Sequence, residues 1–359
     1  LAAAALLVDR YREVEGRLPF PRTVTGLLEE ATPPIDYRLN VRGDVNDEGP
    51  PVARGFLRLF DDIHTPTVVR GSGRLELAEH LVGGGNPLVA RVWVNRVWQW
   101  VFGRGIVATP NDFGRLGAPP THPELLDTLA VEFMRDGWST KRLVRRLVLT
   151  ETFRQGSHAH PAALGADPSN TLLHHHATRR IDAESVRDAL LTVSGRLDPR
   201  LGGPPVRPHR AAEDAAKRLF SGPLDGDGRR SIYLEASIMA PPAFLQAYNQ
   251  PAPKIPTGRR DQTAVPAQAL LLLNDPFVVA MADHWAGRLV ADGRTDPAAR
   301  VEAMFREGLD RAPTDEERAA WLASLHGFAT PGSDPLADRA AWTALAHAMF
   351  LTKEFIHVR

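Results

Sequence analysis

Asp112, His122 and Glu124 lie close together in the sequence and are of the types that carry out acid–base chemistry. A histidine beside two carboxylates can act as a general acid and base, and carboxylate oxygens also bind divalent cations. A second interpretation stays open, because Glu124 falls in the first turn of an expected helix, where the helix dipole favours negative charge. His122, which precedes Pro123, could likewise serve only to cap that helix.

Arg91, Asn95 and Trp98 recur at helical spacing and are therefore expected on one helix face. They could form a ligand-binding site with an aromatic floor, in which Arg91 and Asn95 bind a sugar or a carboxylate. Alternatively, the two polar side chains are buried and hold the following turn, "FGRGIVATPNDFG", through its backbone carbonyls. The second interpretation is favoured, because buried polar groups need hydrogen-bond partners.

Arg180, Glu184 and Arg187 are also at helical spacing, so they are expected on one helix face with Asp188 beside them. A ladder of charges on a solvated face explains this pattern. A structural ion network between two lobes is the other main interpretation, and catalysis comes third.

Arg259, Arg260 and Gln268 belong to "GRRDQTAVPAQALLLLN", in which a polar loop precedes an apolar helix. The two guanidinium groups could bind an anionic ligand or a carboxylate of the first lobe. The alternative is a docking strap that ties parts of the fold together.

The triplet His174 to His176 raises the question of a metal site. Consecutive histidines point in different directions on a helix or strand, so only two could easily share an ion, and no metal site is predicted. The chain has no cysteine, which excludes thiolate ligands, thiol nucleophiles and covalent haem attachment on this chain. Because the sequence also lacks a phosphate-binding loop, a dinucleotide fingerprint and a G-x-S-x-G turn, no cofactor is expected on it.

A chain of 359 residues with 43% hydrophobic and 24% charged residues has an ordinary globular composition. Its length exceeds what one hydrophobic core normally supports, so two lobes are expected. Lysine plus arginine equals aspartate plus glutamate, at 43 each, which leaves no global field to attract nucleic acid. The apolar start, "LAAAALLV", is too short for a membrane span, and none is expected.

Helices are expected to position the candidate side chains. Asn86 followed by Pro87 is typical of a helix start, and this helix should run to about Val101. The next stretch predicts a helical hairpin, whose first helix is capped by Thr121 and whose second is capped by Ser139. Apolar residues at helical spacing indicate that both helices bury one face.

The later part of the chain is also mostly helical. Asp182, Asp296 and Thr314 are expected to cap three helices, and Thr314 with Glu317 should form a capping box. Residues 229–238, "RRSIYLEASI", are the best strand candidate, because they are rich in β-forming residues and bounded by turn residues.

These patterns predict a mainly α, multi-helical fold of two lobes with short strand or hairpin content. Residues 1–72 should hold an N-terminal helix over 1–15 and a Pro/Gly-rich extended segment, as the truncated remnant of an upstream region. The first helical lobe is placed at 73–200 and the second at 231–359. A loop or linker over 201–230, rich in proline and glycine, should separate them.

Several blocks of the sequence occur together in one order: "RGDVNDEGPPVARGF", "NPLVARVWVNRVWQWVFGRGIVATPNDFGRLGAPPTHPELLDTLA", "RRIDAESVRDALLTVSGRLD", "GRRDQTAVPAQALLLLNDPFV" and "GLDRAPTDEER". Taken together, from about Tyr37 to the end, the chain closely resembles the planctomycete-type family known as domain of unknown function 1553.

The resemblance implies a part of a large secreted or periplasmic protein that also carries a planctomycete-type cytochrome c domain and, in some members, carbohydrate-binding modules. Haem would then belong to a separate domain of the parent protein. The expected partners are the other domains of that parent, with a glycan as a further candidate. Two departures stand out, because the family pattern leads us to expect a histidine near Trp100 or Val101 and a cysteine just before Arg259. A haem or metal role is therefore not transferred to these positions.

The leading hypothesis is an extracytoplasmic helical module of a multidomain, cytochrome-associated protein, which binds a ligand or a partner domain in polysaccharide-related metabolism. One alternative is a glycan-acting hydrolase or oxidoreductase that uses Asp112, His122 and Glu124. The other is a purely structural scaffold domain. Convergence of the polar candidates on an open pocket would favour binding or catalysis, whereas their mutual pairing would favour a scaffold.

Overall fold

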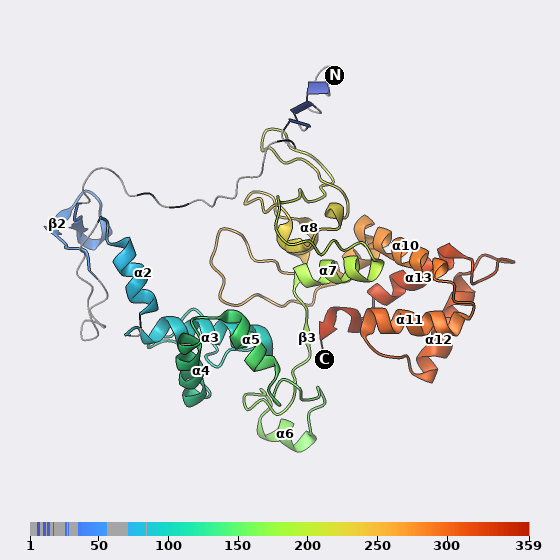
Figure 1. The fold of residues 1–359 in the computed structure, drawn as a ribbon, viewed down its shortest axis with the longest axis horizontal. Coiled ribbons are helices and arrows are strands. Elements are labelled where there is room, and N and C mark those ends of the chain that lie inside the picture. The colour runs from blue at the N-terminus through green and yellow to red at the C-terminus, as the bar shows by residue number, and fades with distance from the viewer. Residues whose placement is uncertain are drawn as a thin grey trace. The chain divides into compact units, whose positions relative to one another are not determined.

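The computed structural model describes residues 35–55, 71–83 and 85–358, together with isolated positions between residues 6 and 28. The helix expected over residues 1–15 lies for the most part outside them. The described residues form twelve α-helices and two antiparallel sheets of two strands each (Figure 1). The prediction of a mainly α, multi-helical protein is confirmed. None of the helices in this described part is both long and apolar enough to cross a membrane.

The chain divides into two compact units, Leu1–Ala177 and Thr178–Arg359. This boundary lies before the loop 201–230, at which the linker is expected from composition. The difference arises because helix α7 (Ala183–Ser194) buries its apolar face in one core with α10 (Pro276–Ala291) and so belongs to the second unit. The intervening loop is part of the same unit.

In the first unit a short hairpin precedes a group of helices in which α3 packs against α4 and α5. The core between these three helices contains Val94, Val97, Leu129 and Leu143, which are all buried. The elements are β1 (Arg38–Asn40), β2 (Glu48–Pro51), α2 (Arg74–Val82), α3 (Pro87–Phe102), α4 (Pro123–Arg135), α5 (Thr140–Val148) and α6 (Pro161–Ala166).

Helix α3 begins and ends as the sequence predicts. The side chain of Asn86 accepts a hydrogen bond from the backbone N–H of Leu88 at 3.0 Å, and Pro87 occupies the first helical position. The helix ends at Gly103, whose φ of +86° is readily adopted only by a residue without a Cβ atom.

The expected helical hairpin is formed by α4 and α5, with one change at its start. Ser139 caps α5 by accepting a hydrogen bond from the N–H of Arg142 at 3.4 Å. The N-cap of α4 is His122 and not Thr121. The Thr121 hydroxyl is used elsewhere, since it donates to the carbonyl of Ile106 at 3.3 Å and lies 2.9 Å from the ring nitrogen of His122.

In the second unit, α10 and α13 lie side by side and carry the centre of the core (Figure 1). Trp285 of α10 and Trp342 of α13 are completely buried there. Strands β3 and β4 pair antiparallel and join the start of this unit to its end. The elements besides α7 and α10 are β3 (Arg179–Arg180), α8 (Ala243–Ala247), α9 (Pro266–Asn274), α11 (Pro297–Leu309), α12 (Asp315–Phe328), α13 (Arg339–Phe350) and β4 (His357–Val358).

The helix starts expected in the second unit are present. Asp296 accepts hydrogen bonds from two backbone N–H groups of α11. The side chain of Thr314 accepts from the N–H of Glu317 at 3.2 Å, and the Glu317 carboxylate accepts from the N–H of Thr314 at 2.8 Å, so the capping box is confirmed. Asp182 is the N-cap residue of α7, although its side chain makes no capping hydrogen bond.

Two expectations for the second unit are wrong. Residues 229–238 form no extended strand, because Ser231–Tyr233 is a 3-10 helix and only the single residues Arg229 and Leu234 bridge to other segments. The carboxylate of Asp188 accepts hydrogen bonds from both the N–H and the hydroxyl of Ser231, which holds the backbone in this turn. Arg180 lies in β3 and not on the helix face of α7, so strand pairing fixes its position.

Candidate functional site

The buried amide of Asn95 holds the turn that follows α3. Its Oδ1 accepts a hydrogen bond from the N–H of Val107 at 2.8 Å, and its Nδ2 donates to the Val107 carbonyl at 3.0 Å. Asn95 is 0% exposed and Val107 is 2% exposed. A Cβ atom at Gly105 would lie 2.6 Å from the Val107 carbonyl oxygen, so the close approach requires glycine. Both ends of the amide are occupied by backbone.

Arg91 and Trp98, the other candidates on α3, also have partners inside the first unit. Arg91 donates to the carboxylate of Asp127 at 2.6 Å and to the carbonyl of Pro87 at 3.2 Å. This hydrogen bond from Arg91 holds the pKa of Asp127 below its usual value. Trp98 is 6% exposed, and its ring centroid lies 4.2 Å from that of Phe102. The face therefore contributes to the core and to one surface ion pair.

The structure does not bring Asp112, His122 and Glu124 into contact with one another. The carboxylate of Asp112 accepts the N–H of Gly114 at 2.8 Å, as in a tight turn. The ring of His122 contacts the Thr121 hydroxyl, and Glu124 is exposed in the first turn of α4. Within the described part of the chain no hydrogen bond or ion pair joins the three residues, and no group of three histidines or carboxylates is arranged to hold a metal ion.

In the second unit, Arg260 and Glu184 form a bidentate ion pair. The two terminal nitrogens of Arg260 donate to the two carboxylate oxygens of Glu184 at 2.5 and 3.1 Å, and both side chains are partly buried. Burial lowers the pKa of Arg260, but the hydrogen bond and the charge of Glu184 act against it and leave the pKa raised. Arg259, the neighbouring residue, is exposed. The pair ties the loop before α9 to α7.

Arg180 and Gln268 lie at the edge of the same region. Arg180 donates to the side-chain oxygen of Asn249 at 2.8 Å and to the carbonyl of Thr263 at 2.7 Å, and its guanidinium lies 5.3 Å from the ring centroid of Tyr248. Burial raises the pKa of the Tyr248 hydroxyl to about 12. Gln268 donates to the carbonyl of the last residue of α8 at 2.9 Å. Both residues therefore hold the connection from α8 to α9. The sequence alone gives no indication that Arg180 and Gln268 lie in the same region.

Arg187 and Asp188 bind the loop that precedes the 3-10 helix. Arg187 is 5% exposed and donates to the carbonyls of Asp225 at 2.7 Å and Arg229 at 2.9 Å, and to the hydroxyl of Ser231 at 3.2 Å. Burial lowers the pKa of this guanidinium. The charges of Arg187 and Asp188 lie 3.9 Å apart, so Asp188 compensates the buried cation while it holds Ser231.

Two further buried arginines bind backbone in the same way. Arg229 donates to the carbonyl of Arg200 at 3.0 Å. Arg300 donates to the carbonyls of Arg294 at 2.8 Å and Leu336 at 2.7 Å. A guanidinium carries several donors in a fixed plane, which suits it to join chain segments that lack regular structure.

The histidine triplet is held by local contacts. The Nδ1 atoms of His174 and His175 lie 3.2 Å apart, and Nε2 of His174 lies 3.1 Å from the carbonyl of Asp167. The ring of His176 packs edge-on against Phe153, with 5.5 Å between the centroids. The rings of His174 and His175 therefore contact each other, whereas the ring of His176 packs against Phe153.

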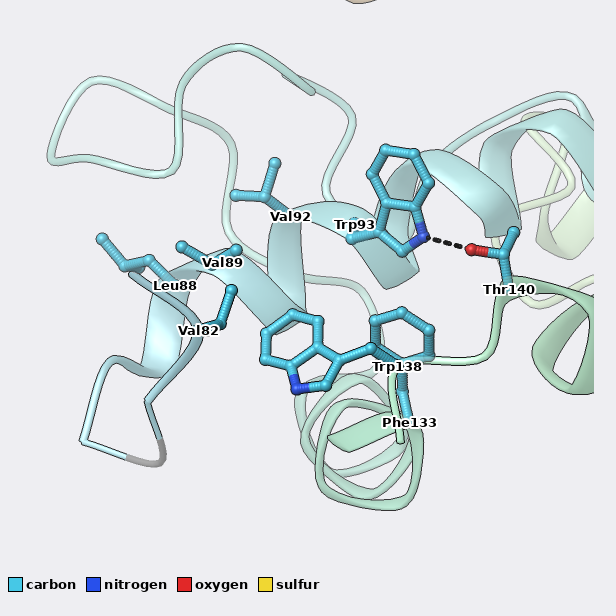
Figure 2. Close-up of a pocket in the computed structure, with 8 residues that line it drawn as sticks. All are labelled: Val82, Leu88, Val89, Val92, Trp93, Phe133, Trp138 and Thr140. Carbon is cyan, nitrogen blue, oxygen red and sulfur yellow. Dashed lines mark hydrogen bonds between the residues drawn. The ribbon is translucent and has the colours of Figure 1, made fainter. Parts of the chain in front are cut away.

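An open apolar pocket of about 480 Å³ lies in the first unit, where the end of α2, the first half of α3 and the turn from α4 to α5 meet (Figure 2). Its lining is almost entirely apolar. The lining residues are Val82, Leu88, Val89, Val92, Trp93, Phe133, Trp138 and Thr140.

Two tryptophans shape this pocket. Trp93 is 38% exposed and donates its indole N–H to the hydroxyl of Thr140 at 3.1 Å. Trp138 adopts a φ of +59° in the turn before α5, and its ring lies 5.3 Å from that of Phe133 (Figure 2). The pocket contains none of the predicted site residues. A signal in the sequence is the second apolar row on α3, in which Val89 and Trp93 are four residues apart.

The comparisons with known proteins give one finding. The model of a family described as PSD1, protein of unknown function (DUF1553), matches residues 73–325. No curated protein and no solved structure matches the chain. The matched range includes all the lining residues of the pocket in the first unit, and it ends within α12 of the second unit, at Leu325.

Proposed function

We propose that this chain, which belongs to the DUF1553 family of proteins of unknown function, is a helical binding module. Its pocket would receive an apolar group of a partner protein. The observation that supports this is the combination of an open apolar cavity with polar candidates that are already paired. Asn95 is bonded to Val107, and Glu184 is bonded to Arg260. The pocket, in contrast, is bordered by side chains that have apolar surface exposed to solvent.

The size and chemistry of the pocket agree with such a role. Binding sites for small groups typically have volumes of roughly 300–1,000 Å³ and mainly apolar and aromatic walls, and this one has about 480 Å³. Val82 is 54% exposed and Trp93 is 38% exposed, so apolar surface faces solvent on two sides of the cavity. Covering that surface is favourable by about 25 cal/mol per Å². An aromatic or leucine side chain fits this environment.

The wider setting is also a proposal. On the strength of the family resemblance, the module acts in a larger, cytochrome-associated protein outside the cytoplasm, in the periplasm or after secretion, in polysaccharide-related metabolism. Its partners are then other domains of that parent, and any haem belongs to one of them. The fold provides a rigid helical surface for such an assembly.

The experiment uses N-phenyl-1-naphthylamine, an uncharged apolar probe, and follows energy transfer from the tryptophans of the whole chain, of which Trp93 and Trp138 line the pocket. The probe is expected to bind, and a neutral peptide that contains Phe-Leu is expected to displace it. Val89→Gln should weaken both by at least about fivefold, since burial of an unpaired amide costs roughly 1–3 kcal/mol. Val131→Gln on the exposed side of α4 serves as the matched control.

Absence of probe and peptide binding would overturn the proposal. Equal binding by wild type and Val89→Gln would do the same, because it would place the bound probe elsewhere. Thermal unfolding of each variant checks that the fold is retained, and Val92→Ile, which keeps the apolar character of the wall, should bind as the wild type does.

A further inference from the structure

Helix α5 carries a concentration of positive charge beside the pocket. Its sequence, "TKRLVRRLV", contains Lys141, Arg142, Arg145 and Arg146 and no acidic residue. The chain as a whole has equal numbers of basic and acidic residues, so this charge is a local feature. Leu143 and Leu147 are buried against the rest of the unit, which leaves the basic side chains on the outer face.

Two of these four side chains already have partners inside the unit, although only Arg146 is paired with carboxylates. Arg146 forms ion pairs with Glu132 and with Asp136, the latter at 3.2 Å, and Arg142 donates to the carbonyl of Asp136 at 3.4 Å. Lys141 and Arg145 are exposed, and their side chains have no hydrogen bond or ion pair with any residue that the structure describes. Two cations are therefore available to a molecule that approaches from solvent.

These cations begin at the edge of the pocket. Thr140 lines the cavity and receives the hydrogen bond of Trp93, and Lys141 is the next residue of the helix. Arg145 follows one turn later on the same side as Lys141. Val144, between them, is 36% exposed. An apolar cavity thus leads to a row of positive charge.

The opposite side of the pocket differs in charge. Val82 lies at the end of α2, and the nearest charged residue of that helix on the same side is Glu79, three residues earlier. An acidic residue is favoured near Lys141 and disfavoured near Glu79. This difference in charge favours one orientation of a bound segment, in which its acidic residues lie on the side of Lys141.

We propose that the occupant is a protein segment in which a large apolar side chain is followed by acidic residues that contact Lys141 and Arg145. This inference rests on the proposed function. Residues four apart on a helix are separated by about 6 Å along its axis. Alternate residues of an extended chain are separated by about 6.6 Å and point to the same side. Two acidic residues spaced by one position therefore match the two cations, with the apolar side chain in the pocket.

The test measures fluorescence anisotropy of labelled peptides on the whole chain. The acidic peptide is Gly-Phe-Leu-Gly-Asp-Gly-Asp, and its neutral counterpart carries Asn in place of both Asp residues. The acidic peptide should bind roughly fivefold to tenfold more tightly at low salt, because each exposed ion pair contributes only modestly. This difference should disappear at 0.5 M salt, where charges are screened.

The variants locate the effect. Lys141→Glu combined with Arg145→Glu should remove the preference for the acidic peptide and leave the affinity for the Asn peptide unchanged. Arg135→Glu and Arg154→Glu together make the same change of net charge on exposed residues away from the pocket lining, and should keep the preference.

The outcomes separate this inference from the proposed function. Equal binding of the acidic and Asn peptides would overturn the inference and leave the apolar site in place. Failure of every Phe-Leu peptide to bind would overturn the proposed function itself. Tighter binding of laurate or of anionic phospholipid vesicles, dependent on Lys141 and Arg145, would assign the site to a lipid and refute a protein partner.

Discussion

Replacement of Asn95 by alanine tests the assignment of this residue to the turn after α3. Asn95 uses both ends of its amide on Val107, at 2.8 and 3.0 Å, and both residues are buried. Asn95→Ala therefore leaves one backbone donor and one backbone acceptor without partners. Water cannot replace the side chain without opening the core around it.

The magnitude follows from these two groups. A buried polar group that loses its partner costs roughly 1–3 kcal/mol, so two cost about 2–6 kcal/mol. Alanine regains about 0.6 kcal/mol, because it favours the helix more than asparagine does. The free energy of unfolding of the first unit should decrease by roughly 1–5 kcal/mol. Asn111→Ala in the same turn, at an exposed residue, should change it by less than about 0.5 kcal/mol.

The assay combines urea unfolding with hydrogen exchange. Because the chain has two units, tryptophan fluorescence and circular dichroism need not change together, and exchange of the peptide that contains Val107 supplies the local measurement. In the wild type this amide should be protected, and in Asn95→Ala it should exchange much faster. An unchanged midpoint with unchanged protection at Val107 would refute the reasoning and return Asn95 to the list of ligand-binding candidates.

Asn95→Asp adds a signature in pH. The new carboxylate would face the carbonyl oxygen of Val107, so its pKa in the folded state would be raised above the unfolded value of about 3.9. A protonated carboxyl group can donate to that carbonyl, but a carboxylate cannot. The deficit in stability relative to the wild type should therefore be smallest below about pH 3.9 and should grow as the pH rises through the raised pKa. Urea unfolding at pH 3.5 and pH 7 measures it.

Two further predictions concern the second unit. Arg260→Met leaves the carboxylate of Glu184 without its bidentate partner and should accelerate limited proteolysis of the loop 250–265 severalfold. Arg259→Met, at the exposed neighbour, should not accelerate it. Equal cleavage rates for the two variants would exclude a role of Arg260 in tying this loop to α7. The N–H groups of Thr330 and Ala341 hold the pKa of Asp338 well below its usual value. The destabilisation caused by Asp338→Asn should therefore be complete above about pH 4 and should decrease as the pH falls below that value. Unfolding midpoints of both proteins from pH 2 to 7 test this, and a penalty independent of pH would contradict it.

The features that the sequence predicts correctly are local ones. Asn86 with Pro87 marks the start of α3, and Thr314 with Glu317 marks the start of α12, because a helix cap involves residues only two or three positions apart. The mainly α fold follows from the same kind of pattern. The start of α4 differs because Thr121 has a non-local partner, the carbonyl of Ile106.

The features that the sequence does not predict depend on contacts between distant residues. Residues 229–238 have strand-forming composition, but hydrogen bonds from Ser231 to Asp188 of α7 hold them in a turn. Arg180 is in register with the helix pattern of Glu184, yet it pairs with a strand at the end of the chain. The pocket is formed from α2, α3 and the turn after α4, and no single stretch contains it.

The arginines that bind backbone carbonyls have a consequence for how the chain can vary. Arg187 binds the carbonyls of Asp225 and Arg229, and every amino acid presents the same carbonyl. Exchanging the Asp225 side chain therefore leaves the bond from Arg187 in place, whereas an exchange of Arg187 removes it. Gly226 is constrained as well, since a Cβ atom there would lie 2.7 Å from a terminal nitrogen of Arg187. Substitution tolerance along this loop is thus limited by Arg187 and Gly226. It is limited as well by Gly228, at which a Cβ atom would lie 2.0 Å from the carbonyl oxygen of Arg196, and by the buried Arg229, which binds the carbonyl of Arg200.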